Sequence, residues 1–406
     1  MVAALATGCD DASDVRVERG VDVHGVTVTD VYTSGGEAGR PVVVMLHGGD
    51  GDPDRMGPLA EAVAHRGAVV YVPTWPVHSR RLAGDALDLA LHDEFEAVVC
   101  ALRHARRTAG EYGGDPDDIT LLGHSAGGFV GAAVAMVAEP PWAAIGCDID
   151  VDHRPQRFIG TSGDYTGSTF PIDEFAGLPE YARSTTDVVD AYDPFVLEAT
   201  NRDLDVRLLH GFGDDIIFPD AAFELRDRLV DQGLDARLLT IDVSHGDPVT
   251  PGPSMDFVAD QIAGLLTRQA TAFEPELTGT LAFDRDRCNY DGPSGLTVAE
   301  AVAVELRNDS DAPLMFGFVA FDSWRPADDG IVLDGGPRQP FDEPPASVEG
   351  QGLVPVPPRT TGTVDWALVD TARPWVLYCL PLDDHPAAGL LHGAVEVVPL
   401  GGPERF

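Results

Sequence analysis

The stretch Leu121-Leu122-Gly123-His124-Ser125-Ala126-Gly127-Gly128 decides the fold of this chain. Residues Gly123–Gly127 form a G-x-S-x-G pentapeptide. An apolar run leads into it and a run of small residues follows it, so a strand should turn here directly into a helix. Glycines remove the Cβ atoms that would clash in so tight a turn, and the serine hydroxyl is left exposed at the start of the helix. A glycine-rich turn with an incidental serine has the same letters, so the interpretation depends on partners elsewhere in the chain.

An apolar run from Pro41 to Leu46 precedes the pentapeptide and predicts a buried parallel strand. It ends in His47-Gly48-Gly49-Asp50, an HGGG-type loop whose last glycine is replaced by aspartate. Backbone N–H groups of Gly48 and Gly49, together with that of Ala126, are expected to form an oxyanion hole. We expect the Asp50 side chain to point away from this hole, because an anion there would oppose the developing negative charge.

Two further strand ends follow the pentapeptide. The run Val206–Gly211 precedes a pair of aspartates, and the run Ala236–Val243 precedes His245. The order serine, acid, histidine predicts a catalytic triad in which Ser125 attacks, His245 transfers the proton and an aspartate orients the imidazole.

The acid of this triad has two candidates. Asp214 stands four residues after His210, in an H-G-x-x-D pattern, and is favoured. Asp215 stands four residues before Pro219, in a D-x-x-x-P pattern, and is the alternative.

These motifs resemble those of the α/β-hydrolase carboxylesterases, in particular the acetyl- and feruloyl-esterase and dienelactone-hydrolase-like branches. The residues that carry the resemblance are His47-Gly48-Gly49, Gly113-Gly114-Asp115-Pro116-Asp117-Asp118-Ile119-Thr120 and Gly123–Gly128. The resemblance covers Val15 to Arg268. It implies an α/β fold with a mostly parallel sheet covered by helices. It also implies serine-dependent hydrolysis of carboxylic esters through an acyl-enzyme, with small or medium acyl groups, polysaccharide-linked ones included, and with no cofactor.

Two alternative functions stay open. A serine peptidase of the same fold would use the same triad and oxyanion hole. A non-catalytic envelope-binding protein on a hydrolase scaffold would need no triad, and fold alone does not exclude it.

Composition sets the class of partner. The chain has 406 residues, 44% of them apolar, which is enough for two domains with their own cores. Its 67 acidic residues outnumber 27 basic ones, all arginine, and give a net charge of −40. Because phosphate binding needs clustered bases, this acidic chain is not expected to bind nucleic acid.

The sequence divides into a tether at 1–14, a hydrolase domain at 15–270, a linker at 271–276 and a β-sandwich domain at 277–406. The last part has short strands separated by turns rich in proline and glycine, which is typical of a sandwich. Within the hydrolase domain, the aromatic-rich stretch 163–200 is expected to cap the site.

The C-terminal part also resembles the cupredoxins through Tyr378-Cys379-Leu380-Pro381 and Gly389–Val395. Leucines Leu314 and Leu391 stand where that family has copper ligands, so the resemblance implies a relative without metal. A disulfide between Cys288 and Cys379 is expected. Cys100 and Cys147 are expected to be small buried hydrophobes, with a bond between them left open.

The segment Met1–Cys9 resembles the end of a bacterial lipoprotein signal, in which small residues precede a lipidated cysteine. Lipidation of Cys9 would attach the protein to a membrane. We therefore expect a location in the cell envelope or outside the cell.

Overall fold

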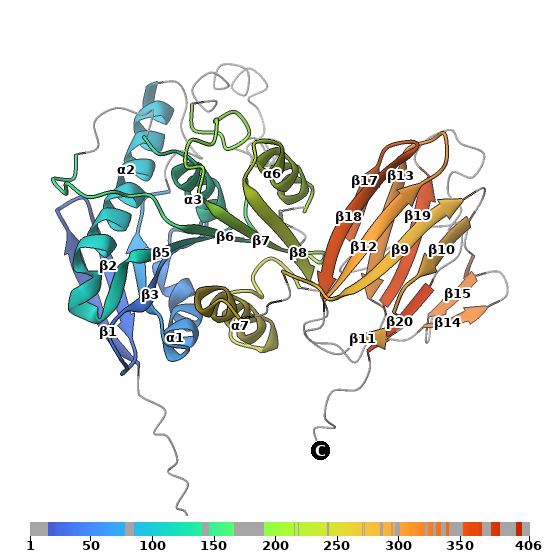
Figure 1. Cartoon of the computed structure of the whole chain (residues 1–406), viewed down its shortest axis with the longest axis horizontal. Coiled ribbons are helices and arrows are strands. Elements are labelled where there is room, and N and C mark those ends of the chain that lie inside the picture. The colour runs from blue at the N-terminus through green and yellow to red at the C-terminus, as the bar shows by residue number, and fades with distance from the viewer. Residues whose placement is uncertain are drawn as a thin grey trace, which may run out of the picture.

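The computed structural model describes most of the chain (Figure 1). The described residues are 15–77, 85–139, 146–165, 191–214, 216–217, 219–241, 243–269, 271, 273–284, 287–293, 295–296, 301–320, 324–327, 330–333, 338–340, 352–367, 375–381 and 395–399. The tether 1–14 with Cys9, most of the expected cap and Asp215 lie outside these residues.

Strands and helices alternate in the first two thirds of the chain. The elements are β1 (Arg16–Val23), β2 (Thr27–Thr33), β3 (Arg40–Leu46), η1 (Pro53–Met56), α1 (Gly57–His65), β4 (Val69–Thr74), α2 (Asp85–Thr108), η3 (Ala109–Tyr112), β5 (Gly114–His124), α3 (Ala126–Met136), β6 (Arg157–Thr161), β7 (Asp205–Gly211), α6 (Asp220–Asp231), β8 (Asp235–Ile241) and α7 (Pro253–Thr267).

The remaining described elements are strands. They are β9 (Leu277–Asp284), β10 (Arg287–Asp291), β11 (Gly295–Leu296), β12 (Ala301–Asn308), β13 (Leu314–Ala320), β14 (Trp324–Ala327), β15 (Gly330–Leu333), β16 (Arg338–Pro340), β17 (Gly352–Val356), β18 (Thr360–Ala367), β19 (Trp375–Pro381) and β20 (Val395–Pro399).

The first eight strands form one sheet in the order β1-β2-β4-β3-β5-β6-β7-β8. Strands β1 and β2 pair antiparallel at the edge, and β3 to β8 are parallel to one another. This confirms the predicted α/β fold with a mostly parallel sheet.

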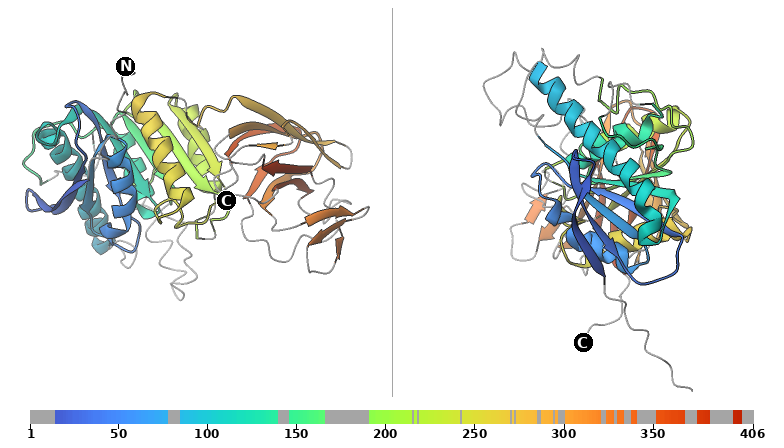
Figure 2. Two further views of the ribbon diagram at one scale, coloured as in Figure 1. Left: turned by 90° about the horizontal axis from the view of Figure 1, so that it is seen from below. Right: turned by 90° about the vertical axis from the view of Figure 1, so that its left-hand side faces the viewer.

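Helices cover both faces of this sheet, and the side chains of β3 show how. Val42 and Val44 pack in the cluster that contains α2, α3 and α6, whereas Val43 and Met45 pack in the cluster that contains α1 and α7. Seen from below, α1 and α7 lie side by side against the sheet (Figure 2). Apolar side chains are buried on both faces of the sheet, and this is why the parallel strands are continuous apolar runs.

The C-terminal strands form two further layers. Strands β18, β12, β9 and β10 make one sheet and β11, β20, β19, β13 and β17 make another, with β14 to β16 in a separate small sheet (Figure 1). Leu281, Val304 and Trp366 of the first layer are buried in one cluster with Phe316 and Leu377 of the second.

The mostly parallel sheet and the first C-terminal layer are continuous. Strand β18 pairs in parallel with β8, through Asp365–Ala367 opposite Leu239–Ile241, so that one sheet has twelve strands. The buried Thr240 donates a hydrogen bond of 2.8 Å from its Oγ1 to the carbonyl oxygen of Asp365. The C-terminal strands therefore complete the β8 edge, which would otherwise present unpaired backbone groups.

The cysteines differ in part from expectation. Cys100 on α2 and Cys147 are both buried, as expected, but they form a disulfide and are not free thiols. The bond links α2 to the segment that leads into β6. Cys379 is also disulfide-bonded, so its sulfur is not available as a copper thiolate; the side chain of Cys288 lies outside the described residues.

No helix in the described part of the chain is both long enough and apolar enough to cross a bilayer.

We expect Thr240→Val to lower the free energy of unfolding by about 1 kcal/mol, because it leaves the Asp365 carbonyl without its side-chain donor. Urea unfolding followed by circular dichroism measures this change. Thr267→Val on α7, where the lost hydrogen bonds run only to Ala263 and Gly264 of the same helix, is the control and should stay within about 0.5 kcal/mol of wild type. Equal stability of Thr240→Val and wild type would contradict a stabilising β8–β18 junction.

Candidate active site

Ser125 occupies a strained turn between β5 and α3. Its backbone has φ 53° and ψ −120°, a conformation that non-glycine residues rarely adopt. Any Cβ on Gly123 would lie 2.2 Å from the carbonyl oxygen of Gly127, and one on Gly127 would lie 2.8 Å from that of His47. The two glycines are therefore required for strand, turn and helix to approach one another this closely.

Three side chains from distant parts of the chain meet at this turn. His245 Nε2 lies 2.9 Å from Ser125 Oγ, and His245 Nδ1 lies 2.9 Å from Asp214 Oδ2. Ser125 follows β5, Asp214 follows β7 and His245 follows β8, and parallel strands bring their carboxyl ends to one edge of the sheet. The structure thus brings together Ser125, Asp214 and His245, the three residues singled out in the sequence.

The carboxylate of Asp214 is buried and held on several sides. Its Oδ1 accepts hydrogen bonds from the backbone N–H groups of Ile216, at 3.1 Å, and Ile217, at 2.8 Å. Burial alone would raise the pKa of Asp214, but hydrogen bonds and positive charge from His210 and His245 outweigh it and hold that pKa below its usual range. Asp214 is therefore an anion at neutral pH.

His210 contacts Asp214, and the sequence did not reveal this contact. Its buried Nε2 donates to the carbonyl oxygen of Ile217 at 2.8 Å and lies 3.4 Å from Asp214 Oδ2. The H-G-x-x-D spacing used to choose Asp214 thus reflects a physical contact between its first and last residues.

The three backbone amides expected to form an oxyanion hole lie next to Ser125. A Cβ on Gly48 would lie 3.2 Å from Ser125 Cβ, and Ala126 is the first residue of α3. Across the described residues, the N–H groups of Gly48, Gly49 and Ala126 donate to no acceptor. Free amides at a loop and a helix N-terminus are the groups that can hold an oxyanion.

The oxyanion loop is fixed from behind by His47. Its Nδ1 donates to the carbonyl oxygen of Gly48 at 2.9 Å, and its Nε2 accepts from the N–H of Trp75 at 3.4 Å. The two rings stack with centroids 5.1 Å apart. Burial lowers the pKa of His47, so it holds the loop as a neutral ring.

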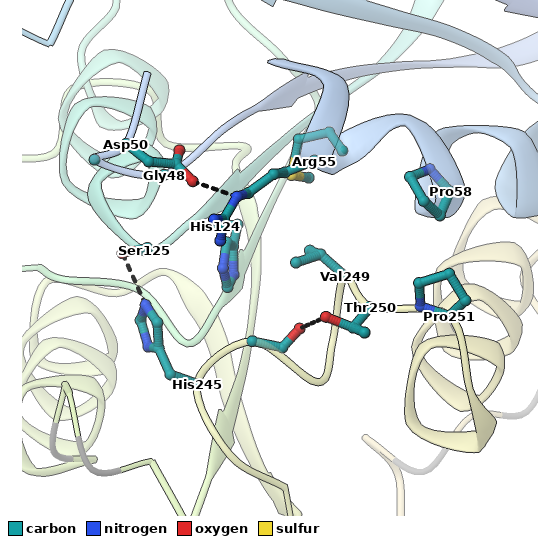
Figure 3. A pocket seen from close by; sticks show the side chains of 13 residues that line it. Gly48, Asp50, Arg55, Pro58, His124, Ser125, His245, Val249, Thr250 and Pro251 are labelled. Atoms are coloured by element: carbon teal, nitrogen blue, oxygen red, sulfur yellow. Dashed lines mark hydrogen bonds and ion pairs between the residues drawn. The ribbon is translucent and has the colours of Figure 1, made fainter. Parts of the chain in front are cut away.

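Asp50 has a partner that the sequence did not indicate. Its Oδ2 forms an ion pair of 2.7 Å with Arg55 Nε of η1 (Figure 3). The negative charge beside the oxyanion loop is therefore balanced locally. Nothing in the local sequence pattern links the loop to Arg55, so the sequence does not predict this ion pair.

His124 lies beside the triad without joining it. Its Nδ1 bonds to the carbonyl oxygen of Thr161 at 3.1 Å, and its ring centroid is 5.1 Å from that of His245. Burial, and then the positive charge of His245, lower the pKa of His124 to about 3. Because a carbonyl only accepts, Nδ1 carries the hydrogen of this neutral ring and Nε2 is an acceptor.

A cavity of about 470 Å³ opens over these groups. The loop before α1 forms one wall and the loop after His245 forms the opposite wall (Figure 3). The lining residues are Gly48, Gly49, Asp50, Arg55, Met56, Pro58, His124, Ser125, His245, Gly246, Val249, Thr250 and Pro251.

Comparison with known proteins identifies the domain. Residues 43–206 match the model of the alpha/beta hydrolase family, in agreement with the α/β-hydrolase fold of the parallel sheet and its helices. No curated protein matches the sequence.

Solved structures are similar to this part of the chain. A truncated carbohydrate esterase from gut microbiota has a TM-score of 0.50 at 15% identity, over 64% of this chain and 98% of its own. A butyrate-bound esterase from the Planctomycetes species Thermogutta terrifontis has a TM-score of 0.49 at 18% identity, over 64% and 95% of the two chains. A sugar hydrolase from Lactococcus lactis has a TM-score of 0.46 at 18% identity, over 61% and 96%.

We expect the fold to lose stability as the pH falls below about 6.5, the ordinary histidine pKa. Burial lowers the pKa of His47, His104 and His124, and lowers that of His153 to about 4. The unfolded chain then binds protons that the folded chain does not, so the free energy of unfolding falls with pH, by up to about 1.4 kcal/mol per pH unit for each histidine. The lowered pKa of Asp214 further reduces the free energy of unfolding at still lower pH, because the unfolded chain protonates this carboxylate first.

Melting temperature recorded from pH 8 to pH 4.5 measures this loss. His153→Gln, which lies outside the cavity, should make the decline shallower, because one of the proton acceptors of the unfolded chain is removed. A melting temperature independent of pH across this window would contradict the prediction.

Proposed function

We propose that this protein is a serine-dependent hydrolase of carboxylic esters that works through an acyl-enzyme. The observation that carries the proposal is the continuous chain from Ser125 Oγ through His245 to the buried Asp214, with both links at 2.9 Å. Three free amides beside the serine supply the second requirement of acyl transfer.

The geometry accounts for each step of the reaction. Ser125 Oγ attacks the ester carbonyl carbon while its proton passes to His245 Nε2. The carbonyl oxygen becomes an oxyanion held by the N–H groups of Gly48, Gly49 and Ala126. His245 then gives the proton to the leaving alcohol, and the acyl group stays on Ser125. Water, deprotonated by His245, releases the acid and restores the serine.

Asp214 supports these proton transfers without taking part in them. Its carboxylate accepts the Nδ1–H of His245, which leaves Nε2 free to receive the serine proton. Because the pKa of Asp214 is held low, the carboxylate stays ionised and stabilises the imidazolium formed in each half of the reaction.

Esters of small or medium acyl groups, polysaccharide-linked ones included, are the substrates that we propose. The cavity of about 470 Å³ beside Ser125 is in the range of sites that bind part of a small-molecule substrate. The carbohydrate esterase with which the chain shares its fold is consistent with such a substrate.

Hydrolysis of p-nitrophenyl esters from acetate to laurate tests the reaction. Wild type should turn over the short esters, and Ser125→Ala should lower kcat by at least about 10³-fold, since the nucleophile is lost. Ser254→Ala on α7, away from the cavity, should match wild type. Absence of ester turnover by wild type would contradict the proposal. Cleavage of peptide but not ester substrates would favour the serine-peptidase alternative, and inertness to both would favour a binding protein.

We also propose that the protein is exported and attached to the cell envelope through a lipid on Cys9. The Cys100–Cys147 disulfide supports export, because such bonds persist in oxidising compartments. Mass spectrometry of the protein isolated from its native cells should find a diacylglyceryl-modified cysteine at the mature N-terminus and should find Cys100 and Cys147 oxidised. An unmodified Cys9 in a soluble fraction would contradict the anchor, and free thiols at Cys100 and Cys147 would contradict export.

A further inference from the structure

We propose that the cavity beside Ser125 holds the leaving alcohol of the ester, and that Arg55, Asp50 and His124 select an uncharged alcohol rich in hydroxyl groups, such as a sugar. This inference rests on the proposed ester hydrolysis and adds to it the side of the ester bond that is recognised.

The position of His245 assigns the cavity to the leaving alcohol. In the transition state the carbonyl oxygen points at the N–H groups of the oxyanion loop, and the leaving oxygen must lie within hydrogen-bond reach of His245 Nε2 to receive its proton. The cavity is lined by His245 itself and by its own loop, Gly246 to Pro251. The group attached to the leaving oxygen therefore extends into this space.

Arg55 supplies hydrogen-bond donors to the cavity. The side chain runs from η1 towards Asp50, with Nε 2.7 Å from Asp50 Oδ2, and it lines the cavity together with Ser125 (Figure 3). Its terminal Nη1 and Nη2 groups have no acceptor among the residues that the structure describes. The side chain is 70% exposed, so a ligand in the cavity can reach these donors.

Hydrogen-bond acceptors line the same cavity. Nε2 of His124 carries no hydrogen and bonds to no described residue, because the hydrogen of this ring sits on Nδ1 and bonds to Thr161. Oδ1 of Asp50 accepts only a long hydrogen bond of 3.3 Å, from the N–H of Asp52. A hydroxyl group donates one hydrogen bond and accepts others, so neighbouring hydroxyls match this alternation of donors and acceptors.

Charge argues for an uncharged alcohol. The guanidinium of Arg55 is already balanced by Asp50, and Asp52 adds a further negative charge to the same loop, whereas Asp54 is paired with Arg19. On a chain of net charge −40, this surface repels an anionic ligand. An apolar alcohol is disfavoured for a different reason. It would displace water from the Arg55–Asp50 ion pair without replacing the hydrogen bonds that the water makes.

A set of esters with one acyl group and three alcohols tests the inference. The substrates are a mono-acetylated methyl xyloside, cyclohexyl acetate, and the acetate ester of a hydroxy acid. Wild type should have a kcat/KM for the xyloside at least about tenfold above that for either of the others. Arg55→Met, which keeps the stem and removes the donors, should lower the ratio of xyloside to cyclohexyl ester about tenfold, the size of one lost charge-assisted hydrogen bond.

Asp50→Asn should lower the same ratio, because the amide no longer offers two acceptor oxygens.

Arg154→Met is the matched control. Arg154 is also an exposed arginine paired with an aspartate, Asp152, but it lies outside the cavity lining. The ratio of kcat/KM for the xyloside to that for the cyclohexyl ester should therefore be the same in Arg154→Met and wild type. A ratio unchanged in Arg55→Met, or a preference of wild type for the anionic ester, would overturn the inference.

Failure of the inference is distinguishable from failure of the proposed function. If wild type hydrolyses p-nitrophenyl acetate in a Ser125-dependent manner but Arg55→Met leaves the ratio unchanged, ester hydrolysis stands and the selectivity is refuted. If wild type hydrolyses no ester, the proposed function fails, and the inference with it. Competitive inhibition of p-nitrophenyl acetate hydrolysis by methyl xyloside, weakened in Arg55→Met, would support the subsite independently of the ester series.

Discussion

The close packing of β5 against α3 at Ser125 is the constraint on which the site depends. The serine adopts a positive φ only because Gly123 and Gly127 let the strand and the helix approach within contact distance of each other and of the oxyanion loop. The neighbouring strand supports the same turn, since the N–H of Ser125 bonds to the carbonyl oxygen of Thr161 at the end of β6. Strain of this kind persists only where the surroundings over-determine it, and here three strands and a helix do so.

Charge is distributed unevenly between the surface and the site. The chain carries 67 acidic residues, and one of them, Asp214, is buried beside His245, where two backbone N–H groups and two histidines hold it as an anion. The histidines that surround the site, His47 and His124, are held neutral by burial. The Nδ1 side of the His245 imidazole therefore faces the fixed negative charge of Asp214, which favours protonation of His245 during the proposed acyl transfer.

Much of this arrangement could be read from the sequence, because it is encoded locally. A strand, a tight turn and a helix leave a short pattern at Gly123–Gly127, and the ends of β7 and β8 leave patterns around Asp214 and His245. Contacts between segments distant in sequence leave none. The Arg55–Asp50 ion pair depends on how η1 turns back over the oxyanion loop, and the Cys100–Cys147 bond depends on where the segment before β6 crosses α2. The sequence predicts that both cysteines are buried, but it does not predict that their sulfur atoms meet.

The pairing of β8 with β18 is the most extensive of these contacts between segments distant in sequence. It connects the C-terminal strands to the strand that precedes His245. Alternation of apolar residues predicts a sandwich but cannot say that one of its strands joins the sheet of another part of the chain. Strand β8 ends at Ile241, four residues before His245, and it is held between β7 on one side and β18 on the other. Because a strand paired on both edges moves less than a free edge strand, the C-terminal layer limits the freedom of the loop that carries the histidine. The C-terminal layer is therefore part of the scaffold that positions His245.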